Sequence, residues 1–270
     1  MDKRPVGIFD SGIGGLTVLH EIGLLLPREN LVYLGDTARV PYGTKSTDTI
    51  IRYSVENTRF LMSKDVKAVV VACNTASAAA GDVLRKSFDV PILGVIEAGV
   101  EEAVGRSKSG KIGVIGTAGT IQSGKYEALL RGSGVTKIIS APCPLFVPLA
   151  EEGWTDNKVA EEVAKIYLEP FLNGAVDTLI LGCTHYPLLE KIIGKVCGGG
   201  VALINSANAI ARKLSDRLSA SALQNDSGAG ERKFYFTDSI ERARAVGSRF
   251  LGENMDSRVQ LADLSEFSRH

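Results

Sequence analysis

One kind of segment occurs twice in the sequence and limits what the chain can fold into. The first copy covers residues 66–75 and the second covers residues 176–185. Each consists of a short apolar run, a small residue, a cysteine and then polar residues, and the two cysteines are Cys73 and Cys183. An apolar run that is too short for a helix is typical of a buried strand in a parallel sheet. We therefore predict an α/β fold in which each cysteine follows a strand and precedes a helix, where open α/β sheets bind ligands.

The segments around the two cysteines follow the same order in both halves of the chain. In the first half the pattern predicts helices over residues 16–26, 48–64 and 76–85, and strands over residues 5–9, 31–34, 91–95 and in the run before Cys73. In the second half it predicts helices over residues 98–106, 121–131, 158–172 and 188–196, strands over residues 111–116, 135–140, 201–205 and in the run before Cys183, and a loop over residues 141–153. This repeat predicts two pseudo-symmetric α/β domains with mainly parallel sheets and a site in the cleft between them.

The last part of the chain is not a third copy of the repeat. Its pattern predicts helices over residues 207–218 and 239–251, and strands over residues 233–237 and 258–264. This segment is small for a separate domain, so we expect it to pack on one of the two halves.

The charge balance argues against nucleic-acid and membrane partners. The chain has 31 basic and 31 acidic residues and no basic cluster that would attract a polyanion. It lacks the apolar stretch of a signal peptide and any apolar segment long enough to span a bilayer. We therefore expect a cytoplasmic protein whose four cysteines are reduced thiols. Two of these, Cys143 and Cys197, are assigned no role.

The repeated cysteines are the strongest candidates for chemistry. A single buried cysteine is most simply a small hydrophobic residue. Cys73 and Cys183, however, stand at equivalent strand ends, and each is followed by residues that form hydrogen bonds. The N-terminus of a helix favours the thiolate, so we expect a thiol pKa below its ordinary value of about 8.5.

Two acidic residues lie in corresponding loops. Asp10 follows the first strand and precedes a glycine-rich turn, which lacks the spacing of a dinucleotide-binding motif and the lysine of a nucleotide-binding loop. Its carboxylate could orient a catalytic group, bind a substrate ammonium group, or cap the following helix. Glu151 lies in the proline-rich loop of the second half, where it could act in the same way or be an ordinary surface acid.

His185 lies two residues after Cys183 and admits three interpretations. It could exchange protons with the thiol, complete a zinc site with Cys73 and Cys183, or cap the following helix. His20 and His270 are assigned no role. Hydroxyl and amide groups follow several of the predicted strands, and together with helix N-termini they suit a carboxylate ligand. These groups belong to Ser11, Asn74, Thr75, Thr117, Thr120 and Thr184, with the backbone of Tyr42 and Gly43.

Four motifs resemble those of bacterial glutamate racemases, which belong to the cofactor-independent aspartate/glutamate racemase superfamily. They are Asp10-Ser11-Gly12-Ile13-Gly14-Gly15, Pro41-Tyr42-Gly43, Ala72-Cys73-Asn74-Thr75 and Gly182-Cys183-Thr184-His185-Tyr186-Pro187. The resemblance covers nearly the whole chain, and the last motif is its most specific part.

The resemblance implies a function and a set of site residues. The chain would interconvert L- and D-glutamate and supply D-glutamate for peptidoglycan, without pyridoxal phosphate or a metal. Cys73 and Cys183 would be the two acid–base residues, supported by Asp10, Glu151 and His185. Substrate contacts would come from Asp10, Ser11, Pro41, Tyr42, Gly43, Asn74, Thr75, Thr117, Thr120, Thr184 and His185.

The resemblance also implies a domain division and an assembly. Residues 1–97 and 208–270 would form the first domain, residues 98–207 the second, and the chain would form a homodimer. Other interpretations remain open at this point. They are an aspartate or hydantoin racemase, a non-catalytic protein that binds small acids, and a zinc enzyme.

Overall fold

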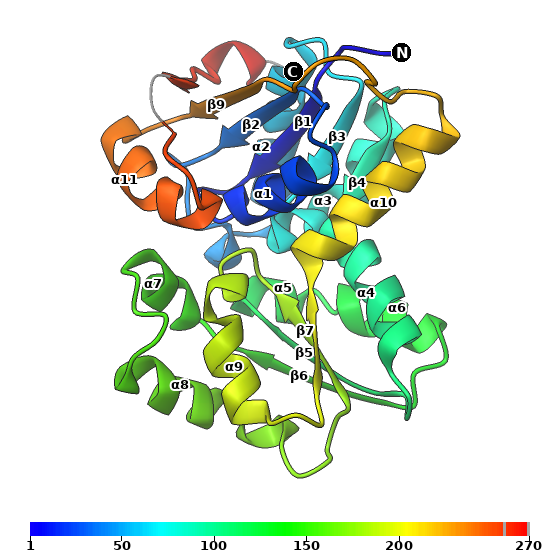
Figure 1. Cartoon of the computed structure of the whole chain (residues 1–270), viewed down its shortest axis with the longest axis vertical. Helices are drawn as coiled ribbons and strands as arrows, with labels where there is room; N and C mark the ends of the chain where they lie inside the picture. The colour runs from blue at the N-terminus through cyan, green and yellow to red at the C-terminus, as the bar shows by residue number, and fades with distance from the viewer. Residues whose placement is uncertain (256–257, 269–270) are drawn as a thin grey trace.

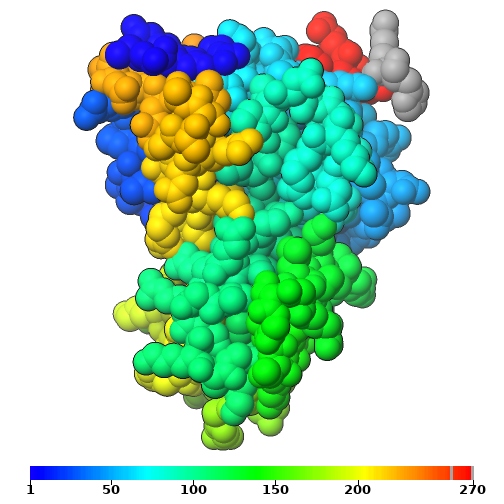
Figure 2. Space-filling view, turned by 90° about the vertical axis from the view of Figure 1, so that its right-hand side faces the viewer, coloured from blue at the N-terminus to red at the C-terminus, as the bar shows by residue number. Residues whose placement is uncertain are grey.

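The computed structural model describes residues 1–255 and 258–268, so His270 lies outside the described residues. The chain forms two parallel sheets, each covered by helices, which lie one above the other along the long axis (Figure 1). In the space-filling view the two halves are in contact across the face that is shown (Figure 2). No described helix is both long and apolar enough to cross a membrane.

The first sheet has six parallel strands in the order β10-β9-β2-β1-β3-β4. Its strands are β1 (Val6–Asp10), β2 (Leu31–Gly35), β3 (Ala68–Val71), β4 (Ile92–Gly94), β9 (Arg232–Phe236) and β10 (Val259–Leu261). The central strands β1, β2 and β3 are buried along their whole length, in keeping with sequences that are apolar except for Asp10 at the end of β1.

The second sheet has four parallel strands in the order β6-β5-β7-β8. They are β5 (Lys111–Gly116), β6 (Lys137–Pro142), β7 (Thr178–Gly182) and β8 (Ala202–Asn205). This order matches β2-β1-β3-β4 of the first sheet strand for strand, which confirms the predicted pseudo-symmetric α/β fold. Cys73 follows β3 and Cys183 follows β7, so the two cysteines stand at equivalent places in the two sheets.

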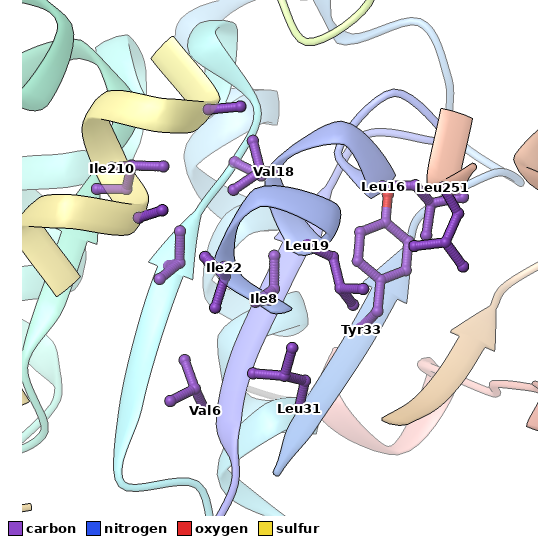
Figure 3. Packing of buried hydrophobic residues seen from close by; sticks show 14 of the residues in the cluster. Val6, Ile8, Leu16, Val18, Leu19, Ile22, Leu31, Tyr33, Ile210 and Leu251 are labelled. Carbon is purple, nitrogen blue, oxygen red and sulfur yellow. The ribbon is translucent and has the colours of Figure 1, made fainter. Parts of the chain in front are cut away.

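Helices cover both faces of the first sheet. Those of the first half are α1 (Leu16–Leu25), η1 (Tyr42–Thr44), α2 (Thr47–Met62) and α3 (Asn74–Ser87). On one face, Leu16, Leu19 and Ile22 of α1 pack on Ile8 and Tyr33 of the strands (Figure 3). On the other face, α2 and α3 enclose a second apolar cluster. Burying both faces of the sheet explains why its central strands carry so few polar residues.

The helices of the second half differ in detail from those predicted. They are α4 (Val95–Arg106), α5 (Ala118–Gln122), α6 (Lys125–Gly132), α7 (Phe146–Glu151), α8 (Lys158–Leu168), η2 (Glu169–Phe171), η3 (Tyr186–Leu189) and α9 (Glu190–Cys197). The single helix predicted over residues 121–131 is wrong, because Gly124 adopts a left-handed conformation (φ +64°) between α5 and α6. The loop predicted over residues 141–153 is also wrong, since it contains α7.

Several predicted boundaries need correction. The helix after Cys73 begins at Asn74 and not at residue 76, so Cys73 is its N-cap residue. The strand predicted over residues 135–140 runs from Lys137 to Pro142. The helix predicted over residues 188–196 is a 3₁₀ turn followed by α9, and the strand predicted over residues 258–264 is limited to β10.

The C-terminal segment packs on the first half, as predicted. It contains α10 (Ser206–Ala220), β9, α11 (Ile240–Leu251), β10 and η5 (Ser265–Phe267). Strand β9 pairs with β2 and extends the first sheet, while α10 packs against α1. The division of the chain at residues 97/98 and 207/208 stays a prediction.

Candidate functional site

The carboxyl ends of the two sheets meet, and hydrogen bonds join the residues that follow the strands. Thr75 Oγ1, after β3, lies 3.0 Å from Oγ1 of both Thr117 and Thr120, which follow β5. Thr17 Oγ1 on α1 donates a hydrogen bond of 2.9 Å to the carbonyl oxygen of Thr184, after β7. Because parallel strands expose their ligand-binding loops at this edge, the two halves contribute to one common site.

Cys73 is buried at the N-terminus of α3, and its sulfur lies 3.6 Å from Ser11 Oγ. Burial, followed by the negative charge of Asp10, raises the pKa of the Cys73 thiol to about 12. The N–H of Ala76 and the hydroxyl of Ser11 act in the opposite direction and are outweighed. The expectation that the helix N-terminus lowers the pKa of this thiol is therefore wrong, because desolvation is the larger effect. Electrostatic repulsion from Cys183 also raises the pKa of the Cys73 thiol, so the two sulfurs lie close enough to interact.

Cys183, His185 and Glu151 form a chain of polar contacts. The Cys183 sulfur lies 3.8 Å from His185 Nδ1, and His185 Nε2 lies 3.1 Å from Glu151 Oε1. Burial lowers the pKa of His185, but hydrogen bonds to Cys183 and Glu151 outweigh it and raise that pKa to about 10. Both contacts therefore favour the imidazolium form of His185. The hydrogen bond to His185 in turn lowers the pKa of Glu151, which also pairs with Arg242 at 3.2 Å.

This chain of contacts bears on the interpretations of Glu151 and His185. Glu151 ends the short helix α7 and its side chain is only 22% exposed, so it is not an ordinary surface acid. His185 precedes η3 without forming a side-chain cap. Among the described residues, no group of three or more His, Cys, Asp or Glu side chains is arranged to bind a metal ion.

Asp10 is the last residue of β1 and is buried beside the glycine-rich turn that leads to α1. Its Oδ2 accepts a hydrogen bond of 3.0 Å from the N–H of Gly12, whereas its Oδ1 is buried without a partner. Burial raises the pKa of this carboxyl group above its ordinary value. The turn approaches the second half closely, because a Cβ added at Gly14 would overlap Thr184 Oγ1 and His185 Nδ1.

Asn74 carries a buried hydrogen-bond donor without a partner, just as Asp10 carries a buried acceptor without one. Its Nδ2 is buried and has no hydrogen-bond acceptor, although the residue itself is only 3% exposed. Buried polar atoms without a partner are rare in folded proteins and call for an explanation. An acceptor at Asp10 and a donor at Asn74 match the ammonium and carboxylate groups of an amino acid.

The Pro41-Tyr42-Gly43 segment is held by residues that the sequence interpretation missed. The Tyr42 hydroxyl donates to Asp36 and accepts from Asn57 Nδ2 at 3.0 Å. Arg39 Nε donates to Asp36 Oδ2 at 2.7 Å, and the same guanidinium also contacts Glu56. The close spacing of Asp36 and Arg39 before Pro41 is the sequence signal that could have revealed this network.

The network brings part of its segment to the site. A Cβ built at Gly43 would lie 3.1 Å from Thr117 Oγ1, so Gly43 borders the threonines of the second half. Tyr42 is buried, whereas Pro41 is exposed. The structure thus brings together the predicted residues of both halves, with Pro41 at the margin. The members linked by these contacts are Asp10, Ser11, Gly43, Cys73, Thr75, Thr117, Thr120, Glu151, Cys183, Thr184 and His185.

The other two cysteines differ in their relation to the site. Cys143 is fully buried, and burial together with Cys183 raises its pKa to about 12, so it lies near Cys183. Cys197 ends α9, and burial alone raises its pKa, to about 11.

A cavity of about 220 Å³ adjoins the site. It is lined by Gly12, Ile13, Thr37, Val40, Glu151, Ser239, Arg242 and Ala243. The cavity therefore extends from the glycine-rich turn to the Glu151–Arg242 pair. A larger hollow of about 750 Å³ lies between β4 and α10 and contains none of the site residues.

Comparison with known proteins identifies the family. A family model described as Asp/Glu/Hydantoin racemase matches residues 22–214. A glutamate racemase of Geobacter metallireducens is 48% identical over 264 residues, which cover 97% of this chain and 98% of that protein. The chain belongs to the glutamate racemases. The identification from the four sequence motifs is thereby confirmed.

Solved structures of glutamate racemases share the fold over nearly their full length. The structure of a glutamate racemase isoform from Bacillus anthracis aligns with a TM-score of 0.93 at 39% identity, covering 98% of this chain and 99% of that chain. A glutamate racemase from Francisella tularensis, solved in complex with D-glutamate, aligns with a TM-score of 0.91 at 38% identity, covering 98% of this chain and 100% of that chain. The arrangement of two parallel sheets is thus that of the racemase family.

Proposed function

We propose that this chain interconverts L- and D-glutamate by proton transfer at Cα, with Cys73 and Cys183 as the two acid–base residues. The observation that carries the proposal is the placement of the two thiols. They follow equivalent strands of the two sheets and contact polar side chains that follow the strands of both halves. Cys183 also contributes to raising the pKa of Cys73. Inversion of a stereocentre needs a base on one face of the carbon and an acid on the other, and two such thiols provide both.

The proposed reaction has two steps. One sulfur, as a thiolate, removes the α-hydrogen as a proton and leaves its electron pair on Cα. The opposite sulfur, as a thiol, delivers its proton to the other face of that carbanion. Each sulfur then has the protonation state that its partner had before, so the reverse reaction or exchange with solvent restores the starting state. No electron leaves the substrate, and the balance needs no oxidant, reductant or cofactor.

The two sulfurs have different neighbours. The Cys183 sulfur lies 3.8 Å from His185 Nδ1. Cys73 lies beside Asp10, and burial together with that carboxylate raises the pKa of the Cys73 thiol to about 12. We propose that these two sulfurs, one from each half, supply the base and the acid of the reaction.

The remaining polar groups suit the substrate. Asp10 Oδ1 and Asn74 Nδ2 are buried without a partner. Asp10 Oδ1 would accept a hydrogen bond from the α-ammonium group, and Asn74 Nδ2 would donate one to a carboxylate. Further donors would come from Ser11, Thr75, Thr117, Thr120, Thr184, His185 and the backbone of Pro41, Tyr42 and Gly43. Fixed donors at the α-carboxylate stabilise the charge that develops on the carbanion.

The biological role follows from the family. Glutamate racemase activity supplies D-glutamate for peptidoglycan, and we propose the same role for this chain. Its cytoplasmic location, its assembly as a homodimer and its lack of nucleic-acid and membrane partners stay predictions from the sequence. Light scattering during size-exclusion chromatography would measure the oligomeric state.

The function is tested with the purified chain, dialysed against a metal chelator and assayed without pyridoxal phosphate. Circular dichroism should show that L-glutamate and D-glutamate each approach an equal mixture of enantiomers. L-Aspartate and a 5-substituted hydantoin, as the rival substrates, should react much more slowly. Racemisation of either rival substrate in preference to glutamate would overturn the assigned substrate, and activity only after metal or pyridoxal phosphate is added would overturn the mechanism.

A further inference from the structure

A tyrosine that the proposed mechanism does not use contacts the substrate-facing asparagine. Tyr126 lies on α6 in the second half, and its hydroxyl donates a hydrogen bond of 2.7 Å to Asn74 Oδ1. Both residues are almost fully buried, at 3% exposure each. The contact joins the two halves of the chain immediately beside Cys73.

The hydrogen bonds around Tyr126 determine which atom of Asn74 faces it. Ser206 lies beside the tyrosine hydroxyl, and its own proton is donated to the carbonyl oxygen of Leu181 at 3.0 Å. The tyrosine therefore uses its proton for Asn74, and burial raises the pKa of Tyr126 so that the proton is retained. A donor at this position requires that Asn74 present its oxygen, which leaves Nδ2 on the other side of the amide.

We infer that Tyr126 is a positioning residue that holds the Asn74 amide with Nδ2 toward the carboxylate of the substrate. The inference rests on the proposed function, because that function supplies the carboxylate. It explains the buried, unpartnered Nδ2, which has no acceptor among the described residues. Without the tyrosine hydroxyl, the amide can turn by half a rotation and present Oδ1, which repels a carboxylate.

The test replaces Tyr126 by phenylalanine. The variant keeps the aromatic ring, which packs against Gly182, and removes only the hydroxyl. We expect KM for both enantiomers to rise about ten-fold and kcat to change less than about three-fold, since the lost contact exists in the bound substrate as well as in the transition state. Tyr167→Phe is the matched control, because its hydroxyl accepts an exposed hydrogen bond from the Leu145 N–H, and it should leave both constants unchanged.

A double-mutant cycle with Asn74→Ala separates positioning from a merely structural effect. Tyr126→Phe should not raise KM further once the amide is absent, and the side-chain amide resonance of Asn74 should shift in Tyr126→Phe and not in Tyr167→Phe. An unchanged KM in Tyr126→Phe, or an equal rise in KM with and without the Asn74 amide, would overturn the inference. If the unmodified chain fails to racemise glutamate, the proposed function fails and the inference fails with it.

Discussion

Glu151 Oε1 and His185 Nε2 lie 3.1 Å apart, and this contact favours the positively charged form of a buried imidazole. The opposite nitrogen of His185 faces the sulfur of Cys183 at 3.8 Å. A carboxylate on α7 thus acts on a thiol after β7 through the ring between them. The cavity that adjoins the site is also bounded by Glu151, so the pair lies between the thiol and open space.

Replacing Glu151 by glutamine should weaken the electrostatic effect of residue 151 on His185. The pKa of His185 should fall below its value of about 10 because the neutral amide no longer favours the imidazolium. We expect kcat to decrease about ten-fold, as for the partial loss of a general acid–base group. Glu152→Gln is the matched control, since Glu152 is the exposed neighbour and should retain normal activity. NMR titration of His185 measures the pKa directly, and an unchanged value in Glu151→Gln would contradict the account.

Glu151→Gln should also change how the free energy of unfolding depends on pH in acid. The pKa of Glu151 is lower in the folded chain than its ordinary value of 4.5, so the carboxylate contributes stability that is present above pH 4.5 and lost as the pH falls through the folded pKa. The free energy of unfolding should therefore decrease less steeply below pH 4.5 in Glu151→Gln than in Glu152→Gln. Urea unfolding at a series of pH values measures both slopes, and parallel curves would show that the His185 contact does not stabilise the charged form.

Gly14 should tolerate no side chain. A methyl group there would overlap Thr184 and His185, so Gly14→Ala must displace the turn or the histidine. We expect kcat/KM to fall by at least about 100-fold, because displacements of about 1 Å at a reacting site cost that much. Gly132→Ala is the control, since a Cβ at Gly132 has open space around it, and it should keep full activity. Full activity of Gly14→Ala would contradict this expectation, since it would show that the turn and His185 can separate without lowering kcat/KM.

The sequence predicted those parts of the fold that depend on local pattern. The apolar runs before Cys73 and Cys183 form buried strands, and the repeated order of elements gives two sheets with the same strand arrangement. Helix α7 was missed because the prolines in residues 141–153, which are Pro142, Pro144 and Pro148, are typical of loops. Pro148, however, is the third residue of α7, and the first turn of a helix needs no N–H donor there.

Contacts between distant segments could not be predicted in the same way. From the sequence, the Tyr126 ring is most simply a core residue of a helix. Its hydrogen-bond partner Asn74 is 52 positions away along the chain. The charge on His185 depends on Glu151, which is 34 positions away and reaches it only because α7 packs near η3. The direction of the Cys73 pKa shift depends on burial, and the sequence alone suggested the opposite direction from the helix N-terminus.

The central claim is tested most directly by following chirality and deuterium at Cα of glutamate in D₂O, for the unmodified chain and for Cys73→Ser, Cys183→Ser and Cys197→Ser. We predict that the unmodified chain and Cys197→Ser invert glutamate and introduce deuterium into the product. Cys73→Ser and Cys183→Ser should each lose inversion by at least about 10³-fold, since a serine hydroxyl cannot replace the acid–base thiol. Inversion at the unmodified rate in either of these two variants would contradict the two-thiol mechanism.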